Sequence, residues 1–168
     1  MIKTIAATAV GGTYVELRIH PSSMYNLLSK IHKVMGEHKR KGCGFELVDP
    51  RSLHVTAMYS TAPIAEDKQI KLAKPDYVYP AKVVGTQLFG EDKDILVLEL
   101  ESDQLQDVHT KWKEAGGKPT WPDYKPHVTI SKGKCKPRKA VREDLDEALK
   151  DLEIKLYREQ AQPIAKDY

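Results

Sequence analysis

Apolar and polar side chains alternate along residues 13–19, the first regular pattern in the chain. Three apolar residues fall on one face of this stretch, and the other face carries Tyr14, Glu16 and Arg18. Alternation with a period of two is typical of a strand that buries one face. We therefore predict a strand whose apolar face joins the core while its polar face stays open.

The period changes to that of a helix after Pro21. Apolar residues then recur every three or four positions, at Met24, Leu27, Leu28, Ile31, Val34 and Met35. This spacing predicts an amphipathic helix that is capped by a serine at its start. The basic cluster 39–41, followed by glycine, suits its carboxyl end. A short strand is expected at 45–48, before a turn at Asp49-Pro50.

The second half of the chain repeats this order of elements. Strands are predicted at 81–89 and 95–101, and a helix then runs from Ser102 or Asp103 to a Gly-Gly stop. A proline-rich loop covers 118–126. Beyond the next strand, a further helix begins near Pro137, and an alternating strand spans 153–159.

Strand–helix–strand–strand order thus occurs twice, with a proline-containing connection between the copies. We predict an α+β fold of two pseudo-symmetric lobes, each an antiparallel sheet backed by helices, facing a central cleft. The first lobe covers about 13–60, the linker about 61–80 and the second lobe about 81–160, within one domain of 168 residues.

Composition narrows the class of protein. Charged residues make up 30% of the chain and hydrophobic residues 40%, as in ordinary globular proteins. No apolar stretch is long enough for a membrane span, and residues 5–10 are too short for a signal peptide. Cys43 and Cys135 form no CxxC motif and are expected to be free thiols in a cytoplasmic protein. A net charge of +3 does not by itself indicate nucleic-acid binding.

One tripeptide occurs twice, as His54-Val55-Thr56 and His127-Val128-Thr129. About 0.3 His-x-Thr triplets are expected by chance in this composition, so one copy would carry little information. Both copies lie in apolar, β-branched runs that predict strands. In a strand, each histidine shares a face with its threonine, while the valine between them points to the core.

This pair of motifs holds the groups that phosphodiester transfer requires. Two histidines can supply a general base and a general acid near neutral pH. Two threonine hydroxyls can donate hydrogen bonds where charge develops on a phosphoryl group. We predict His54, Thr56, His127 and Thr129 as catalytic residues, with no cofactor. Which histidine is the acid stays open.

A metal site is the competing use of histidine. Zinc sites need three or four converging His, Cys or carboxylate ligands, and threonine is a poor ligand. Neither cysteine lies at ligand spacing from a motif, so no metal is expected. The other four histidines are expected to be ordinary polar residues: His20, His32, His38 and His109.

Strand parity and composition nominate residues that would bind substrate. Tyr14 and Tyr124 are candidates for stacking a base, and Arg18 and Lys132 for contacting a phosphate. Glu159 is expected on the cleft face of the last strand. The tyrosines could equally cover the sheet edge. The basic run from Lys132 to Lys139 suits either a solvated loop or steering of a polyanion.

The two motifs, their place in two lobes and the length of the chain resemble the 2H phosphoesterase superfamily. Pro126 before the second motif also looks like the family's Pro-His-x-Thr. RNA-end members commonly continue the first motif with Phe and Gly, whereas here Met58-Tyr59-Ser60 follows. This continuation, together with Ile130-Ser131-Lys132 after the second motif, is more similar to that of phage anti-CBASS phosphodiesterases. Those enzymes destroy the cyclic oligonucleotide signals of bacterial immunity.

The resemblance implies a metal-independent phosphodiesterase with a 2H phosphoesterase-like fold. Its substrate would be a cyclic di- or trinucleotide, or alternatively a short RNA with a 2′,3′-cyclic phosphate end or a 2′–5′ junction. A catalytically silent nucleotide-binding module is a third reading. We expect no membrane association, no obligatory protein partner and a cytoplasmic location, that of the host if the protein is viral.

Overall fold

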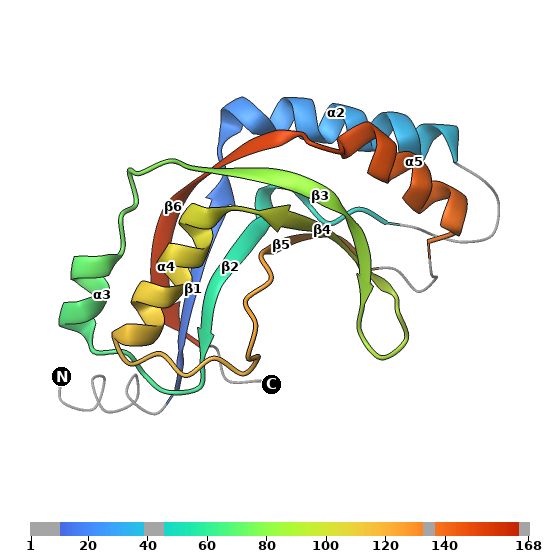
Figure 1. Cartoon of the computed structure of the whole chain (residues 1–168). Coiled ribbons are helices and arrows are strands. Elements are labelled where there is room, and N and C mark those ends of the chain that lie inside the picture. The colour runs from blue at the N-terminus through green and yellow to red at the C-terminus, as the bar shows by residue number, and fades with distance from the viewer. Residues whose placement is uncertain (1–10, 39–45, 133–136, 165–168) are drawn as a thin grey trace.

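The computed structural model describes residues 11–38, 46–132 and 137–164 (Figure 1). Its strands are β1 (Thr13–Ile19), β2 (His54–Ser60), β3 (Tyr79–Phe89), β4 (Ile95–Glu101), β5 (His127–Lys132) and β6 (Glu153–Pro163). Its helices are α2 (Pro21–Glu37), α3 (Glu66–Leu72), α4 (Asp103–Glu114) and α5 (Lys139–Leu149), with a short 3₁₀ turn at Pro50–Ser52.

The strands pair antiparallel in the order β1-β2-β5-β4-β3-β6, and β6 returns to pair with β1. The α+β class with antiparallel strands backed by helices is therefore confirmed. The two expected sheets are joined edge to edge, because β6 pairs with both β1 and β3. At the opposite junction, β2 and β5 pair at Val55 and Val128.

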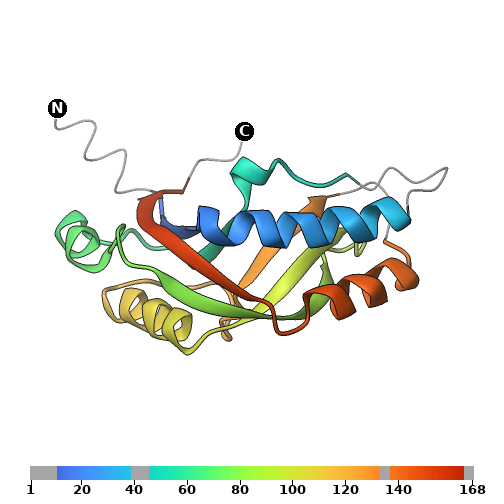
Figure 2. The same cartoon turned by 90° about the horizontal axis from the view of Figure 1, so that it is seen from above.

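Helices cover the outside of this sheet. Figure 2 shows α2 and α5 lying along one side of the molecule, where they pack against each other, α2 against β6 and α5 against β3. The helix α4 lies against β2 and β3. Buried side chains from strands and helices form one core: Leu17, Leu27, Val55, Leu98, Trp112, Val128, Leu145 and Ile154 are among those with no exposed surface. Burial of these apolar surfaces holds the two halves together.

Most element predictions are confirmed, and the differences have local causes. His20, rather than a serine, caps α2, since its ring nitrogen accepts the Ser22 amide hydrogen. The predicted linker contains the short helix α3. The strand expected at 45–48 is reduced to a bridge between Leu47 and Ser131. Both cysteines, the segment 5–10 and the basic cluster 39–41 lie outside the described residues.

None of the helices in the described ranges has the length and apolarity required to cross a membrane.

Candidate active site

The two His-x-Thr motifs lie side by side on neighbouring strands. Val55 and Val128 pair directly and are fully buried, so the histidines and threonines project from the opposite face. Extending this antiparallel register sets His54 opposite Thr129 and Thr56 opposite His127. The two histidines are therefore diagonal neighbours across the two strands. In a regular antiparallel ladder, the Cα atoms of diagonal neighbours are about 7–8 Å apart. The four candidate catalytic residues are thus brought together on one face.

The same local interaction orients both imidazoles. Nδ1 of His54 lies 2.7 Å from the carbonyl oxygen of Ser52, and Nδ1 of His127 lies 2.8 Å from that of Lys125. A carbonyl oxygen only accepts, so Nδ1 carries the hydrogen in both rings. Nε2 is therefore the nitrogen left to take or give a proton. Both side chains are half-buried.

Tyr14 contacts the first motif directly. Its hydroxyl lies 2.9 Å from Oγ1 of Thr56, and its ring meets the His54 ring edge-on, with centroids 6.2 Å apart. Burial raises the pKa of the Tyr14 phenol above its ordinary value. The phenol consequently stays neutral at physiological pH and keeps its hydrogen bond to Thr56.

Arg18 lies next to His54 in the β1–β2 register. Its guanidinium donates to Glu16 Oε1 at 3.0 Å and to the Arg51 carbonyl at 3.1 Å. Gln160 also donates to Glu16, at 3.2 Å. These residues line a groove of about 480 Å³, made by Tyr14, Glu16, Arg18, Asp49, Arg51, Ser52, His54, Gln160 and Gln162. The groove thus extends from His54 across β1 and β6.

Tyr124 and Lys132 both lie close to a motif, but Tyr124 is partly buried and Lys132 is exposed. The Tyr124 hydroxyl donates to the carbonyl of Thr56 at 2.7 Å, and its ring stacks on His109. Burial, and secondarily Tyr14, raises the pKa of Tyr124 well above its ordinary value. One face of this ring is thus already covered by protein. Lys132 ends β5 with its side chain exposed.

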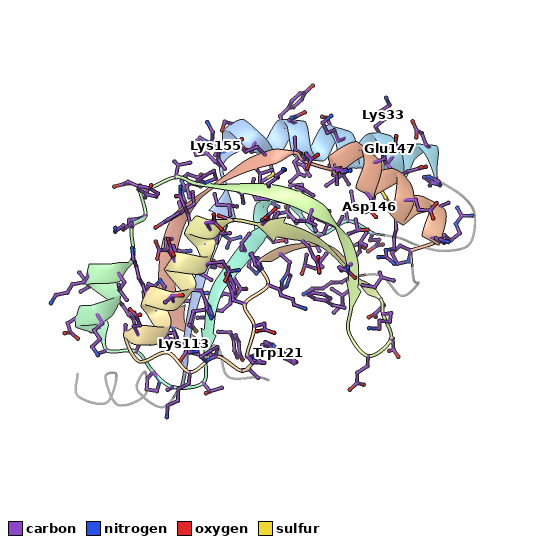
Figure 3. All side chains as sticks on the ribbon, viewed as in Figure 1. Lys33, Lys113, Trp121, Asp146, Glu147 and Lys155 are labelled. Atoms are coloured by element: carbon purple, nitrogen blue, oxygen red, sulfur yellow. The ribbon has the colours of Figure 1, made fainter. Side chains whose placement is uncertain are left out.

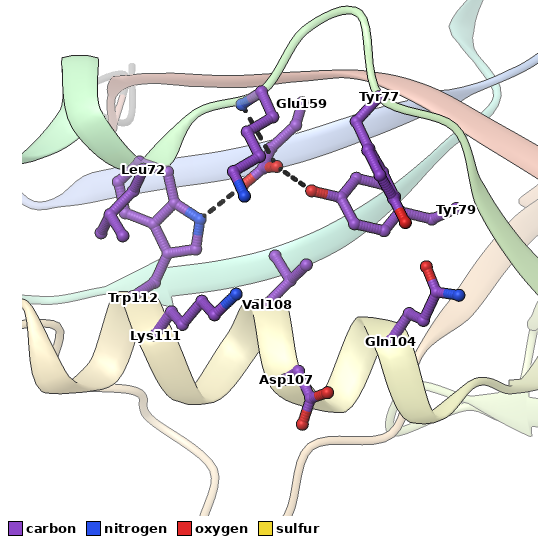
Figure 4. A pocket seen from close by; sticks show the side chains of 10 residues that line it. Leu72, Tyr77, Tyr79, Gln104, Asp107, Val108, Lys111, Trp112 and Glu159 are labelled. Carbon is purple, nitrogen blue, oxygen red and sulfur yellow. Dashed lines mark hydrogen bonds between the residues drawn. The ribbon is translucent and has the colours of Figure 1, made fainter.

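Glu159 does not lie on the cleft face, and the parity expectation was wrong for this residue. The β1–β6 register shifts between Glu16 and Arg18, and Arg158 has a positive φ of 55°. This bulge turns Glu159 toward the protein interior, where it is 2% exposed. Its carboxylate accepts hydrogen bonds from Trp112 Nε1 at 2.8 Å and from the Tyr79 hydroxyl at 2.6 Å (Figure 4). Gln160 takes the cleft position instead.

Sequence reasoning gave no site role to three other residues, of which Tyr59 and His109 contact Tyr14 and β2. Tyr59 is 46% exposed and meets Tyr14 edge-on at 6.1 Å. Trp121, 74% exposed, projects from the loop between α4 and β5, on the side of the molecule away from α2 (Figure 3). Nδ1 of His109 hydrogen-bonds to the carbonyl oxygen of Ala57 in β2. The consecutive Ala57-Met58, which interrupts the alternation of β2, was the available signal for the displaced Tyr59.

The described residues contain no group of three or more His, Cys, Asp or Glu side chains suited to holding a metal ion. Of the other histidines, His20 caps α2 and His38 contacts Asp144 of α5 at 2.5 Å. His32 is exposed on α2.

Comparison with known proteins identifies the family. The family described as Anti-CBASS protein Acb1 matches residues 11–168. The chain belongs to the Acb1 family. An Anti-CBASS protein Acb1 from Vibrio phage KVP40 is 28% identical over 122 residues, which make up 71% of this chain and 72% of the phage protein. The expected anti-CBASS branch is therefore confirmed.

Solved structures show the same fold for this Acb1-family chain. TT0787 of Thermus thermophilus matches with a TM-score of 0.53 at 17% identity, covering 90% of this chain and 82% of that one. Kluyveromyces marxianus Usb1 matches with a TM-score of 0.52 at 13% identity, covering 92% and 95%. The fold is that of 2H phosphoesterases, as expected. Membership of the Acb1 family supports a role in countering CBASS.

Proposed function

We propose that this Acb1-family chain is a metal-independent phosphodiesterase that cleaves 3′–5′ linkages in cyclic di- and trinucleotides, acting in the cytoplasm of the infected cell. One observation carries the proposal. Each histidine is tied through Nδ1 to the carbonyl two residues earlier and lies across the β2–β5 junction from the other motif's threonine. Two imidazoles whose Nε2 atoms have no hydrogen-bond partner among the described residues, together with two hydroxyls, would thus face a bound phosphodiester.

The reaction follows from these groups. One histidine accepts the proton of the 2′-hydroxyl, whose oxygen forms a bond to the adjacent phosphorus. The bond from phosphorus to the 5′-oxygen breaks, and the other histidine, protonated at Nε2, gives its proton to that oxygen. Thr56 and Thr129 donate hydrogen bonds to the non-bridging oxygens as charge develops. The product is a linear nucleotide with a 2′,3′-cyclic phosphate.

Substrate binding would use the groove beside His54. Arg18 is held by Glu16 and the Arg51 carbonyl, so its guanidinium is already oriented. A guanidinium in this position can contact a second phosphate of the ring, and Lys132 can do the same from β5. Tyr14, together with the exposed Tyr59, offers an aromatic surface for a base. Replacing Arg18 or Lys132 with Met should raise KM more than it lowers kcat.

The substrate tests the proposal directly. Purified protein is incubated with 3′–5′-linked cyclic di- and trinucleotides, with a 2′-deoxy cyclic dinucleotide, and with RNA oligomers that carry defined ends, and the products are resolved by mass. We expect cleavage of the ribose rings to 2′,3′-cyclic or 3′-phosphates, and resistance of the deoxyribose ring. Resistance is also expected wherever the neighbouring 2′-oxygen is esterified.

Two outcomes would contradict the proposal. Rapid hydrolysis of the 2′-deoxy ring would show that water, rather than the 2′-hydroxyl, attacks phosphorus. Activity confined to 2′,3′-cyclic RNA ends would assign the protein to RNA-end processing, with the same four motif residues. The His54→Ala and His127→Ala double variant is the matched control for contaminating nucleases.

A further inference from the structure

Each motif strand contains a β-bulge directly after its threonine. In the β1–β2 ladder, Glu16 pairs with Thr56 and Val15 with Met58, so Ala57 is the extra residue. In the β4–β5 ladder, Val97 pairs with Thr129 and Leu96 with Ser131, so Ile130 is the extra residue. The burial patterns of the two strands agree over these positions. The bulge is therefore part of the pseudo-symmetric unit.

The carbonyl of each bulged residue accepts a hydrogen bond from outside its ladder. The carbonyl of Ile130 accepts from the backbone N–H of Val48 at 2.9 Å. The equivalent carbonyl of Ala57 accepts from Nδ1 of His109, on α4, at 2.7 Å. A side chain thus does in the first half what the main chain does in the second. Both carbonyls belong to fully buried residues, or nearly so, where an unpaired polar group is costly.

The His109 ring is itself fixed in place. It stacks on the Tyr124 ring with centroids 4.3 Å apart and planes 2° from parallel. The Tyr124 hydroxyl donates to the carbonyl of Thr56 at 2.7 Å. One stacked pair therefore holds two consecutive carbonyls, those of Thr56 and Ala57. The Thr56 hydroxyl on the cleft face contacts Tyr14 at 2.9 Å.

We propose that His109 is a positioning residue for the first motif. Its Nδ1–H holds the bulge that sets the direction of the Thr56 side chain, as the Val48 amide does for the second motif. His109 does not line the groove beside His54, and in this proposal it takes no part in proton transfer. The kinetic consequence rests on the proposed phosphodiesterase function, while the structural consequence does not.

Two substitutions separate the hydrogen bond from simple packing. His109→Phe keeps a ring that can stack on Tyr124 but removes the donor, and His109→Asn restores a donor near the position of Nδ1. Because small misplacements of catalytic groups are costly, we expect His109→Phe to lower kcat about 10- to 100-fold with little change in KM. His109→Asn should recover most of this loss. His32→Phe, on the exposed face of α2, is the matched control and should match wild type.

A double-mutant cycle tests whether the effect passes through Thr56. In the Thr56→Val background, His109→Phe should cost less than about twofold in kcat, because the group that it positions is already gone. An undiminished loss in that background, or no recovery with Asn, would overturn the proposal. Assays use whichever substrate of the panel the wild-type protein cleaves.

Methyl NMR of threonine-labelled protein gives a readout that needs no turnover. His109→Phe should shift the methyl resonance of Thr56 and leave that of Thr129 in place, and His109→Asn should return the Thr56 resonance toward wild type. An unmoved Thr56 resonance in His109→Phe would overturn the inference even in an active enzyme. A wild-type protein inactive on every substrate would refute the proposed function alone, since the NMR comparison would still decide the role of His109.

Discussion

Both candidate catalytic histidines are half-buried and are oriented by hydrogen bonds from Nδ1 to nearby backbone carbonyls, so neither side chain belongs to the buried core. His54→Ala or His127→Ala should therefore lower turnover by about two to four orders of magnitude while the protein stays folded. Thr56→Val and Thr129→Val should cost less, since each removes one hydrogen bond. Steady-state kinetics with circular dichroism at matched concentrations checks this. Near-normal turnover of His127→Ala would contradict the assignment.

The same variants can tell the acid from the base. A substrate whose leaving group has a low pKa, such as a nitrophenyl phosphodiester with a free 2′-hydroxyl, needs no protonation when the bond breaks. The alanine variant of the general acid should lose much less activity on this substrate than on a cyclic dinucleotide. The variant of the general base should lose similar activity on both. Equal losses for both variants on both substrates would argue against separate roles.

At the scale of the element, the bulge in β6 decides the role of Glu159. Its carboxylate accepts from Trp112, from Tyr79 and from the Lys74 amide at 3.3 Å, so its partners among the described residues are all donors. Glu159→Gln brings an amide N–H toward a donor and should lower the free energy of unfolding by about 1–3 kcal/mol. Denaturant unfolding measures this, with the exposed Glu153→Gln in the same strand as control.

Turnover per folded molecule of Glu159→Gln should stay close to wild type, because this side chain points away from the cleft. A large fall in kcat or a rise in KM with unchanged stability would instead support the substrate contact that alternation along β6 predicts.

The start of β1 packs closely on the end of β2. A Cβ atom added at Gly12 would lie 1.8 Å from the carbonyl oxygen of Ser60, whereas one added at Gly36 on α2 would meet nothing within 4 Å. Gly12→Ala should therefore destabilise the fold by about 1–3 kcal/mol through overpacking. Gly36→Ala should stabilise it by up to about 1 kcal/mol, since alanine favours helix. Equal stability of the two variants in urea would contradict this view of the β1–β2 junction.

For the whole molecule, the proposed chemistry draws acid, base and phosphoryl contacts from side chains on two strands. Activity should therefore persist in excess EDTA, and added Mg²⁺, Mn²⁺ or Zn²⁺ should not raise kcat. Progress curves of dialysed protein with and without chelator measure this. Loss of activity on chelation, restored by one divalent metal, would contradict the mechanism.

The sequence alone determined the features that depend on local periodicity and on residue type. Alternation predicted β1, helical spacing predicted α2 and α4, and two His-x-Thr triplets in strand-like runs predicted the motif residues and their shared face. These predictions work because side-chain direction repeats about every two residues in a strand and about every 3.6 in a helix. The repeated motifs also indicated the family that the comparisons confirm.

Only the tertiary structure decided what depends on register between distant strands. The pairing of Val55 with Val128, which brings the two motifs together, joins residues far apart in the chain. Each bulge adds one residue and reverses the alternation beyond it, which turns Glu159 inward and Tyr59 outward. His109 acquires its contact with Ala57 from the packing of α4 on β2. A local sequence pattern cannot predict these pairings and bulges, because each depends on a partner strand or helix that is distant in the sequence.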